Sequence, residues 1–317
     1  MRENTRIDRS LKEAGSMYDM IIIGAGPAGI AAAVYGKSRG KDVLVLEKNK
    51  VGGLVGKVST VTHYPAIVEG ETGETFARRL LEQAEGAGVP IRIEEVLSAD
   101  LVPEIKTVKT GKGTYEAKTV VLANGGSPKM LGIPGEDLKG VRLNAPKDGK
   151  DYAGKEVFVI GGADGAVKEA LYLADLAGKV TIVCVEDELA CIPEFKEKVD
   201  HKDNIEIMPH SSLKAVSGKD GKADTFEFID NKTKETTVIT DPEAGVFVYA
   251  GIVPNTEQYG QLELDPAGFI VVNEDMETSV PGVFAAGDIR SKKVRQVATA
   301  VSDGAIAGIN AALKAGK

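Results

Sequence analysis

The chain has 317 residues, 43% of them hydrophobic and 27% charged, a length and balance typical of a soluble protein with roughly two domains. Its formal net charge of −8 argues against a general nucleic-acid-binding protein, and we expect no nucleic-acid partner. Two cysteines, Cys184 and Cys191, are too few for a disulfide framework, and three scattered histidines give no zinc signature. We therefore expect a cytoplasmic protein without a metal site.

The N-terminal region carries charge but no apolar core. Residues 1–16 contain seven charged side chains, which is not typical of a secretory signal, and we expect an extension or tag before a natural start at Met17. The longest uncharged stretch, residues 20–36, has 17 residues and contains several glycines. It is shorter than the roughly 20 residues that cross a bilayer, so we expect no membrane association.

The first clear pattern predicts a strand, a glycine-rich turn, a helix and a second strand. These elements are expected at residues 20–23 (strand), 24–29 (the turn GAGPAG), 28–39 (helix) and 43–46 (strand). In the turn, Gly24 allows the tight bend, Gly26 lets a pyrophosphate approach the backbone, and Gly29 lets helix and strand pack closely. Glu47 follows the second strand, where a carboxylate accepts hydrogen bonds from a ribose diol. The pattern predicts dinucleotide binding at the helix N-terminus.

The same pattern recurs in the middle of the chain. Its elements are expected at residues 157–160 (strand), 161–166 (the turn GGADGA), 166–177 (helix) and 180–183 (strand). Ala163 places a methyl group where the pyrophosphate must come close, so this site is weakened. Glu186 would repel the 2′-phosphate of NADPH and suits the free 2′-hydroxyl of NADH. The candidate NAD residues are Gly161, Gly162, Ala163, Asp164 and Glu186. Loss of nicotinamide use and, with less support, use of NADPH remain the alternatives.

The rest of the chain continues this alternation of strands and helices. Short β-branched runs at residues 119–125 and 245–251 end in glycine turns, which favours parallel sheets with crossover helices. Residues 213–239 alternate differently and predict an antiparallel ribbon or meander. Asp288 follows an apolar strand and Gly287, where a carboxylate can bind sugar or ribityl hydroxyls. Residues 295–315 form an Ala- and Gly-rich amphipathic pattern, which predicts a closely packed helix.

The motifs GAGPAG, LANG, YAGIVPNT, GVFAAGD and RQVATA together resemble the low-molecular-weight thioredoxin reductases and related pyridine-nucleotide flavoproteins, over residues 17–312. The resemblance implies two doubly wound Rossmann-like α/β domains and a homodimer. It implies a discontinuous FAD-binding domain, residues 17–129 and 248–317, with an NAD(P)-binding-like domain, residues 130–247, inserted. By this resemblance the FAD contacts would be Gly24, Gly26, Pro27, Ala28, Gly29, Glu47, Lys48, Gly53, Leu54, His63, Val96, Ala123, Gly125, Gly287, Asp288, Arg295, Gln296 and Val297.

The chain departs from that family at the positions of its redox-active dithiol. Asn144 and Lys147 occupy the two thiol positions of the C-x-x-C dithiol in the stretch NAPKDG, and thiol–disulfide exchange requires a thiolate. Lys147 and Asp148 are the remaining catalytic candidates there, Lys147 because an ammonium group can stabilise negative charge. Cys184 and Cys191 are more consistent with a core thiol and a surface thiol than with a relocated redox pair. Leu54 and His63 also replace the family's usual Gln and Asn.

The motifs and the resemblance are consistent with three functions. The first is an FAD-dependent oxidoreductase in which NADH supplies electrons that pass from FAD directly to an acceptor, such as a small redox protein, a quinone-like molecule or oxygen. The second keeps FAD but takes electrons from a protein donor such as reduced ferredoxin, with a vestigial nicotinamide site. The third is a flavin-binding sensor or scaffold without catalysis.

Overall fold

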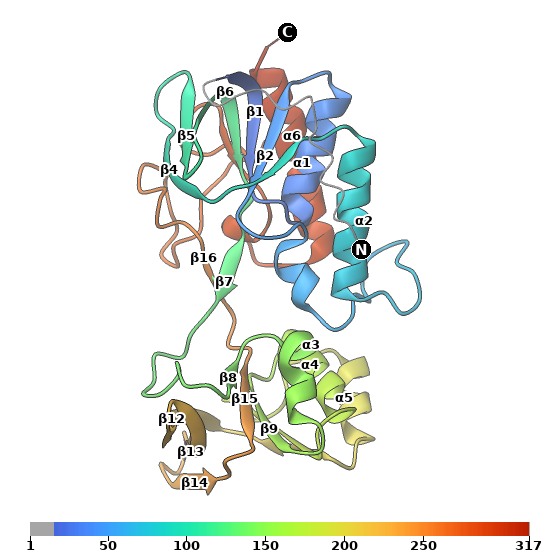
Figure 1. The fold of residues 1–317 in the computed structure, drawn as a ribbon, viewed down its shortest axis with the longest axis vertical. Coiled ribbons are helices and arrows are strands. Elements are labelled where there is room, and N and C mark those ends of the chain that lie inside the picture. Colours follow the sequence, from blue (N-terminus) through green and yellow to red (C-terminus); the bar gives the residue numbers. More distant parts are fainter. Residues whose placement is uncertain (1–15, 317) are drawn as a thin grey trace. The chain divides into compact units, whose positions relative to one another are not determined.

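The computed structural model describes residues 16–316, so nearly all of the predicted extension, residues 1–16, lies outside the described residues. The described chain forms two compact units: residues 57–59 and 128–253 make up the second, and the remainder makes up the first. The chain passes between the units along two short paired strands, β7 (Gly126–Pro128) and β16 (Ile252–Pro254) (Figure 1).

The bounds of the second unit differ slightly from the predicted insertion at residues 130–247. Strand β15 (Gly245–Val248) pairs in parallel with β9 (Glu156–Ile160) along its whole length. It therefore belongs to the sheet of the second unit, which continues to Val253. Which nucleotide each unit binds stays a prediction at this point.

The first unit is built on a seven-stranded sheet in the order β3-β2-β1-β6-β5-β4, with β17 beside β6. Its strands are β1 (Met17–Ile23), β2 (Val43–Glu47), β3 (Ile91–Ile93), β4 (Val96–Asp100), β5 (Lys106–Thr110), β6 (Thr114–Leu122) and β17 (Val283–Ala285). Strands β4, β5 and β6 pair antiparallel, whereas the other pairs are parallel. The predicted parallel sheet is present in β1, β2, β3, β6 and β17, and an antiparallel extension that the sequence analysis did not predict joins it, because short turns, and no crossover helix, connect β4, β5 and β6.

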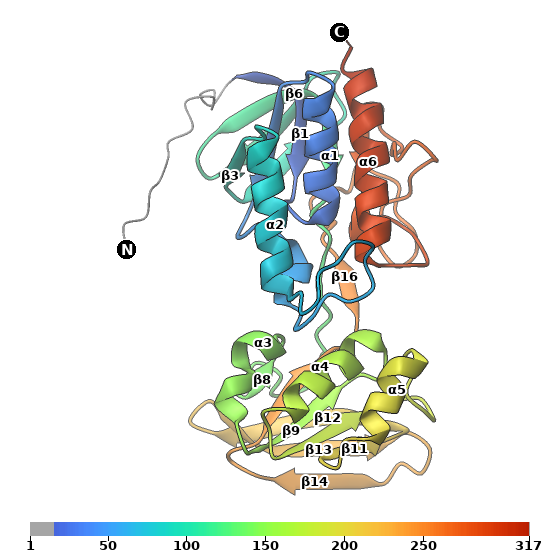
Figure 2. The same cartoon turned by 90° about the vertical axis from the view of Figure 1, so that its right-hand side faces the viewer.

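Three helices lie side by side on one face of this sheet (Figures 1 and 2). They are α1 (Pro27–Ser38), α2 (Gly73–Gly86) and α6 (Val297–Lys314), and two 3-10 turns, η1 (Gly53–Lys57) and η3 (Gly287–Ile289), accompany them. Helix α1 begins with a proline, whose missing N–H is not needed at that position. Helix α6 approaches α1 so closely that a Cβ on Gly304 would lie 2.1 Å from Ala28 O. The small residues of α6 therefore serve helix packing.

The second unit combines a parallel sheet with an antiparallel one. The parallel sheet has the order β11-β10-β9-β15-β8, with β8 (Val141–Arg142), β10 (Lys179–Val183) and β11 (Ile205–Met208). The antiparallel sheet consists of β12 (Ser211–Lys219), β13 (Lys222–Asp230) and β14 (Thr236–Thr240). The helices are α3 (Ala145–Asp148), α4 (Asp164–Ala174) and α5 (Pro193–Asp200), with the 3-10 turn η2 (Gly149–Tyr152). The meander predicted over residues 213–239 is thus confirmed.

Alternation along β9 gives this unit two hydrophobic cores. Val157 and Val159 point to one face of the parallel sheet and pack in a cluster with α4 and α5. Phe158 and Ile160 point to the other face and pack against Phe226 of the antiparallel sheet. A strand buried on both faces reads as a continuous hydrophobic run, which is why VFVI was recognisable in the sequence.

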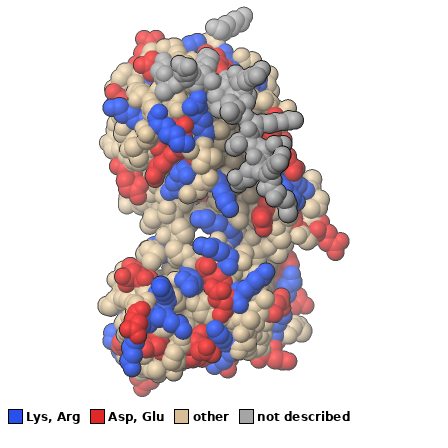
Figure 3. All heavy atoms as spheres, viewed as in Figure 1, with Lys and Arg blue, Asp and Glu red and all other residues tan. Residues whose placement is uncertain are grey.

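The surface carries charges of both signs. On the face in view in Figure 3, Lys and Arg are mixed with Asp and Glu on each unit. No helix within residues 16–316 is both long and apolar enough to cross a membrane.

Candidate functional site

The first glycine-rich turn leaves an open space next to its backbone. Gly24 has φ 103°, and a Cβ there would lie 2.5 Å from Ala123 O, so only glycine fits. A Cβ on Gly29 would lie 1.9 Å from Gly24 O. Gly26, by contrast, has ordinary dihedral angles, φ −74° and ψ −177°, and its nearest prospective neighbour is Gly52 O at 4.0 Å. The absent side chain of Gly26 therefore leaves room for a ligand at the start of α1.

Glu47 is tied to this turn by its carboxylate. Its Oε2 accepts a hydrogen bond from Ala25 N at 2.9 Å, and its Oε1 accepts one from Asn49 N at 2.8 Å. The residue is buried, so these bonds hold the carboxylate in one place beside the turn. Each oxygen retains acceptor capacity for the hydroxyl groups of a ribose.

Several other predicted FAD residues gather at the same turn. A Cβ on Gly53 would lie 3.5 Å from Gly26 Cα, and one on Gly287 would lie 2.8 Å from the Ala28 Cβ. Ala123 donates its N–H to Ile23 O, at the end of β1. The turn, Glu47, Gly53, Ala123 and Gly287 thus come from five separate parts of the chain and form one site.

The structure brings the remaining predicted residues less clearly to that site. Lys48 is exposed, and exposed His63 has its Nδ1 3.0 Å from the hydroxyl of Thr62. The guanidinium group of Arg295 contacts other residues of the chain: it lies 3.9 Å from the ring centroid of Phe269 and donates a hydrogen bond to Lys292 O at 3.0 Å. Contacts of FAD with Pro27, Leu54, Val96, Gly125, Gln296 and Val297 stay predictions.

Asp288 is the polar end of the first site. It belongs to η3, and its Oδ1 is buried without a hydrogen-bond partner, 3.6 Å from Lys292 Nζ. Burial raises the pKa of Asp288, although the charges of Lys292 and Arg295 oppose the increase. An unsatisfied buried oxygen and an open space at Gly26 are what a ligand with hydroxyl groups and a pyrophosphate would fill. The residues present therefore fit FAD.

Sequence reasoning missed three residues around Asp288. Asp303 of α6 accepts hydrogen bonds from Arg290 Nε at 2.8 Å, Arg290 Nη2 at 2.7 Å and Lys292 Nζ at 3.0 Å. Burial opposes ionisation, but these bonds outweigh it and lower the pKa of Asp303. An acidic residue in an otherwise Ala- and Gly-rich helix was the signal that could have revealed this cluster.

The second turn repeats the backbone of the first. Gly161 has φ 130°, and Ala163 has φ −85° and ψ 171°, close to the angles of Gly26. Glu186 is exposed, but its Oε2 reaches the turn, because a Cβ on Gly162 would lie 3.5 Å from it. Helix α4 begins at Asp164, two residues earlier than predicted. Gly161, Gly162, Ala163, Asp164 and Glu186 therefore lie together, as the sequence predicted.

The loop after β10 crosses this turn. Ala163 pairs with Ala190 as an isolated parallel bridge, and Asp164 Oδ1 accepts a hydrogen bond from Ile192 N at 2.8 Å. Asp164 thus brings a negative charge to the first turn of α4, where a pyrophosphate would bind. This arrangement and the methyl group of Ala163 make the second turn a poorer anion site than the first.

The segment NAPKDG, residues 144–149, has a structural role in the second unit. Asn144 is the N-cap of α3, and its Oδ1 accepts a hydrogen bond from Lys147 N at 3.1 Å. Lys147 is exposed and Asp148 is half-buried. Tyr249 holds the same corner by accepting a hydrogen bond from Ala145 N at 2.9 Å.

The surroundings of both cysteines disfavour the thiolate form. Cys184 is buried, and burial followed by the charge of Glu186 raises its pKa. Burial, followed by the charge of Asp164, also raises the pKa of Cys191. A raised thiol pKa decreases the thiolate fraction, which lowers reactivity in disulfide exchange.

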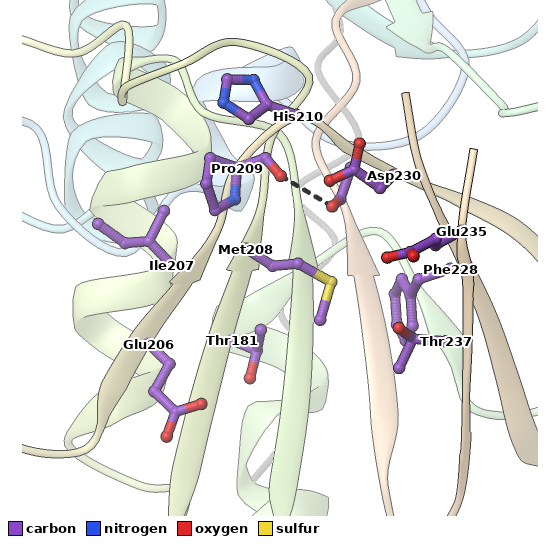
Figure 4. A pocket seen from close by; sticks show the side chains of 11 residues that line it. Thr181, Glu206, Ile207, Met208, Pro209, His210, Phe228, Asp230, Glu235 and Thr237 are labelled. Atoms are coloured by element: carbon purple, nitrogen blue, oxygen red, sulfur yellow. Dashed lines mark hydrogen bonds between the residues drawn. The ribbon is translucent and has the colours of Figure 1, made fainter. Parts of the chain in front are cut away.

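A separate groove lies at the edge of the second unit (Figure 4). Its walls come from β11 and the antiparallel sheet, with Met208 and Phe228 beside the acidic side chains of Glu206, Asp230 and Glu235. It contains none of the predicted site residues. Within residues 16–316 no group of three or more His, Cys, Asp or Glu side chains is placed to hold a metal ion.

Comparison with known proteins agrees with this architecture. The family model described as pyridine nucleotide-disulphide oxidoreductase matches residues 18–304. The chain is 41% identical over 304 residues to a thioredoxin reductase of Peptoclostridium acidaminophilum, covering 93% of this chain and 96% of that protein. The structure of Lactococcus lactis thioredoxin reductase matches with a TM-score of 0.90 and 33% identity, covering 94% and 99% of the two chains. A ferredoxin-flavin thioredoxin reductase from Clostridium acetobutylicum matches with a TM-score of 0.52 and 30% identity, covering 94% and 98%.

Proposed function

The chain belongs to the pyridine nucleotide-disulphide oxidoreductase family, and from this membership we propose that NADH supplies electrons that reach an acceptor through FAD without a protein dithiol. The comparisons confirm four sequence predictions: the family, the α/β fold class, the enzyme class and the cofactor FAD. The electron donor, the acceptor and the bypass of a dithiol are the proposed steps. A homodimer, a small redox protein as acceptor and a cytoplasmic location belong to the same proposal.

The observation that carries the proposal is the capped corner at α3. Asn144 uses its side chain to cap the helix, and neither Asn144 nor Lys147 can form a mixed disulfide. The chain's two cysteines have raised pKa values and lie outside this corner. A thiol relay is therefore not supported by any group at the family's thiol positions.

The residues of the first unit supply binding and orientation. FAD, when bound, accepts hydride from a pyridine nucleotide and passes electrons on to an acceptor. The N-terminus of α1 and the space at Gly26 favour the pyrophosphate, and Glu47 and Asp288 offer carboxylate oxygens to hydroxyl groups. In the second unit Glu186 would accept from the ribose hydroxyls of NADH.

Anaerobic addition of NADH to the yellow protein tests the proposal. We expect the flavin absorbance to bleach within seconds and to return when an artificial acceptor such as a quinone is added. NADPH serves as the matched control, because Glu186 opposes its 2′-phosphate. Flavin that stays oxidised with both nucleotides would contradict the NADH step.

The second candidate takes electrons from reduced ferredoxin. Two observations favour it: Asp164 brings a negative charge to the first turn of α4, and Ala163 has a methyl group where the first turn has Gly26. Similarity to a ferredoxin-flavin thioredoxin reductase is consistent with such a donor. Flavin that is reduced by ferredoxin but not by NADH would select this candidate.

A further inference from the structure

Four charged side chains form a compact cluster around η3 and α6. Asp303 receives both hydrogen bonds of a bidentate pair from Arg290, and Lys292 Nζ lies 3.0 Å from Asp303 Oδ2 and 3.6 Å from Asp288 Oδ1. The side chains of Lys292 and Asp303 are only 6% and 5% exposed. The formal charges of Arg290, Lys292, Asp303 and Asp288 cancel.

The bonds within the cluster are distributed unevenly. Asp303 fixes the backbone around Asp288, because its Oδ2 also accepts from Gly287 N at 3.2 Å. Lys292 Nζ has a second anchor, Thr299 Oγ1 at 3.2 Å, on α6. Asp288 Oδ1, by contrast, is buried and has no hydrogen-bond partner. A buried lysine is costly unless its charge is paired, and Lys292 is paired with Asp303. The same ammonium group lies 3.6 Å from Asp288 Oδ1, so it also stabilises a carboxylate that is free to bind a ligand.

We propose that Lys292 is a positioning residue for the flavin site: held by Asp303 and Thr299, its ammonium group keeps Asp288 charged and oriented to accept hydrogen bonds from the hydroxyl groups of FAD. This inference rests on the binding of FAD at the first turn. It assigns Arg290 and Asp303 the task of fixing η3, and Lys292 the task of setting the charge of Asp288.

The proposal has a defined pH signature. Burial raises the pKa of Asp288, and the charges facing it are Lys292 from the loop after η3, Arg295 from the segment before α6, and Asp303 from α6. Removing the Lys292 charge moves that pKa further upward. Because the ionised carboxylate is the stronger acceptor, FAD should dissociate faster as the pH falls through the Asp288 pKa. Without Lys292 this acceleration begins at higher pH.

The experiment measures how fast the FAD-loaded chain releases flavin, by the rise of flavin fluorescence after dilution, from about pH 4 to about pH 9. We expect K292M to release FAD at least about tenfold faster than the wild type at pH 7, with a smaller ratio at high pH. K292R, which keeps the charge, should stay within about threefold at every pH. If K292M does not fold, K292Q tests the same loss of charge and retains hydrogen bonding to Asp303.

Two controls separate positioning from general stability. K106M removes another buried lysine of the first unit, whose Nζ donates to Pro103 O, and it should leave FAD release unchanged. In a D288N background, K292M should add no further acceleration. A K292M or K292Q variant with lower thermal stability but the wild-type release rate and pH profile would overturn the inference. A wild-type chain that never holds FAD would overturn the FAD assignment on which the inference rests.

Discussion

The two glycine-rich turns of this chain share a backbone but differ in what they leave free. Gly24 and Gly161 both have positive φ, and their N–H groups donate to Leu46 O and Val183 O at 2.8 and 2.9 Å. The first turn has an open space at Gly26, whereas the second carries the methyl group of Ala163 at the same place. The two turns thus keep similar backbone angles although Gly26 in the first is replaced by Ala163 in the second. The backbone conformation of such a turn therefore does not depend on the side chain that faces the ligand space.

The two acidic residues show the same contrast. Glu47 is buried and bonded to two backbone N–H groups, so it is part of the first turn's structure. Glu186 is exposed, and its Oε2 lies near Gly162 of the second turn, 3.5 Å from where a Cβ would be. Its carboxylate is not bonded to the backbone of the turn as that of Glu47 is. The first turn therefore has a fixed carboxylate, whereas the carboxylate of the second is held less firmly. On the function proposed above, the fixed carboxylate would serve a bound FAD and the freer one a pyridine nucleotide that exchanges.

The largest expected effect is the loss of flavin on Gly26→Val. The backbone angles of Gly26 suit any residue, and apart from its chain neighbours the nearest atom to its prospective Cβ is Gly52 O at 4.0 Å, so the fold should persist. The valine would occupy the pyrophosphate space and lower FAD affinity by at least about a hundredfold. The measurement is the flavin absorbance per folded chain. Ala163→Val is the matched control and should keep its flavin; a yellow Gly26→Val protein would refute the site.

The next effect concerns the choice of pyridine nucleotide. The wild type should favour NADH over NADPH by at least about tenfold in the rate of flavin reduction, because Glu186 repels the 2′-phosphate. Glu186→Arg replaces that repulsion with a charge-assisted contact and should change the preference by about a hundredfold in favour of NADPH. Stopped-flow reduction with both nucleotides measures it. Ala163→Gly should improve both nucleotides alike, and an unchanged preference in Glu186→Arg would show that the acid lies outside the site.

A smaller effect is expected on the free energy of unfolding, in which substitutions of Glu47 and Glu186 should differ. Glu47→Gln leaves one of the two backbone N–H groups facing an amide N–H₂, and a lost buried acceptor costs about 1–3 kcal/mol. Glu186→Gln, at an exposed position, should change stability by less than about 0.5 kcal/mol. Urea unfolding of the flavin-free chains compares the two. Equal losses would contradict the structural role of Glu47.

The sequence predicted these turns because they depend on local rules. Gly24 and Gly161 follow buried apolar strands, and a positive φ at that place requires glycine. The antiparallel pairing of β4, β5 and β6 was missed because strand direction depends on connections that the hydrophobic pattern does not reveal. The cluster around Asp303 was missed for a related reason: Arg290 and Lys292 precede α6 by a few residues in an irregular segment, and no helical or strand periodicity shows that this segment folds back onto Asp303.

The smallest expected effect is that of removing both thiols. Cys184 and Cys191 are free cysteines with raised pKa values, and exchange with a disulfide substrate must begin with a thiolate. The double variant Cys184→Ser and Cys191→Ser should therefore reduce an artificial acceptor at the wild-type rate, with NADH or reduced ferredoxin as donor. Neither protein should turn over thioredoxin disulfide with NADH, NADPH or ferredoxin. Thioredoxin reduction that is present in the wild type and lost in the double variant would make these cysteines a relocated redox pair. It would also place disulfide exchange in the loop that follows β10, and not at the α3 corner, where Asn144 caps the helix.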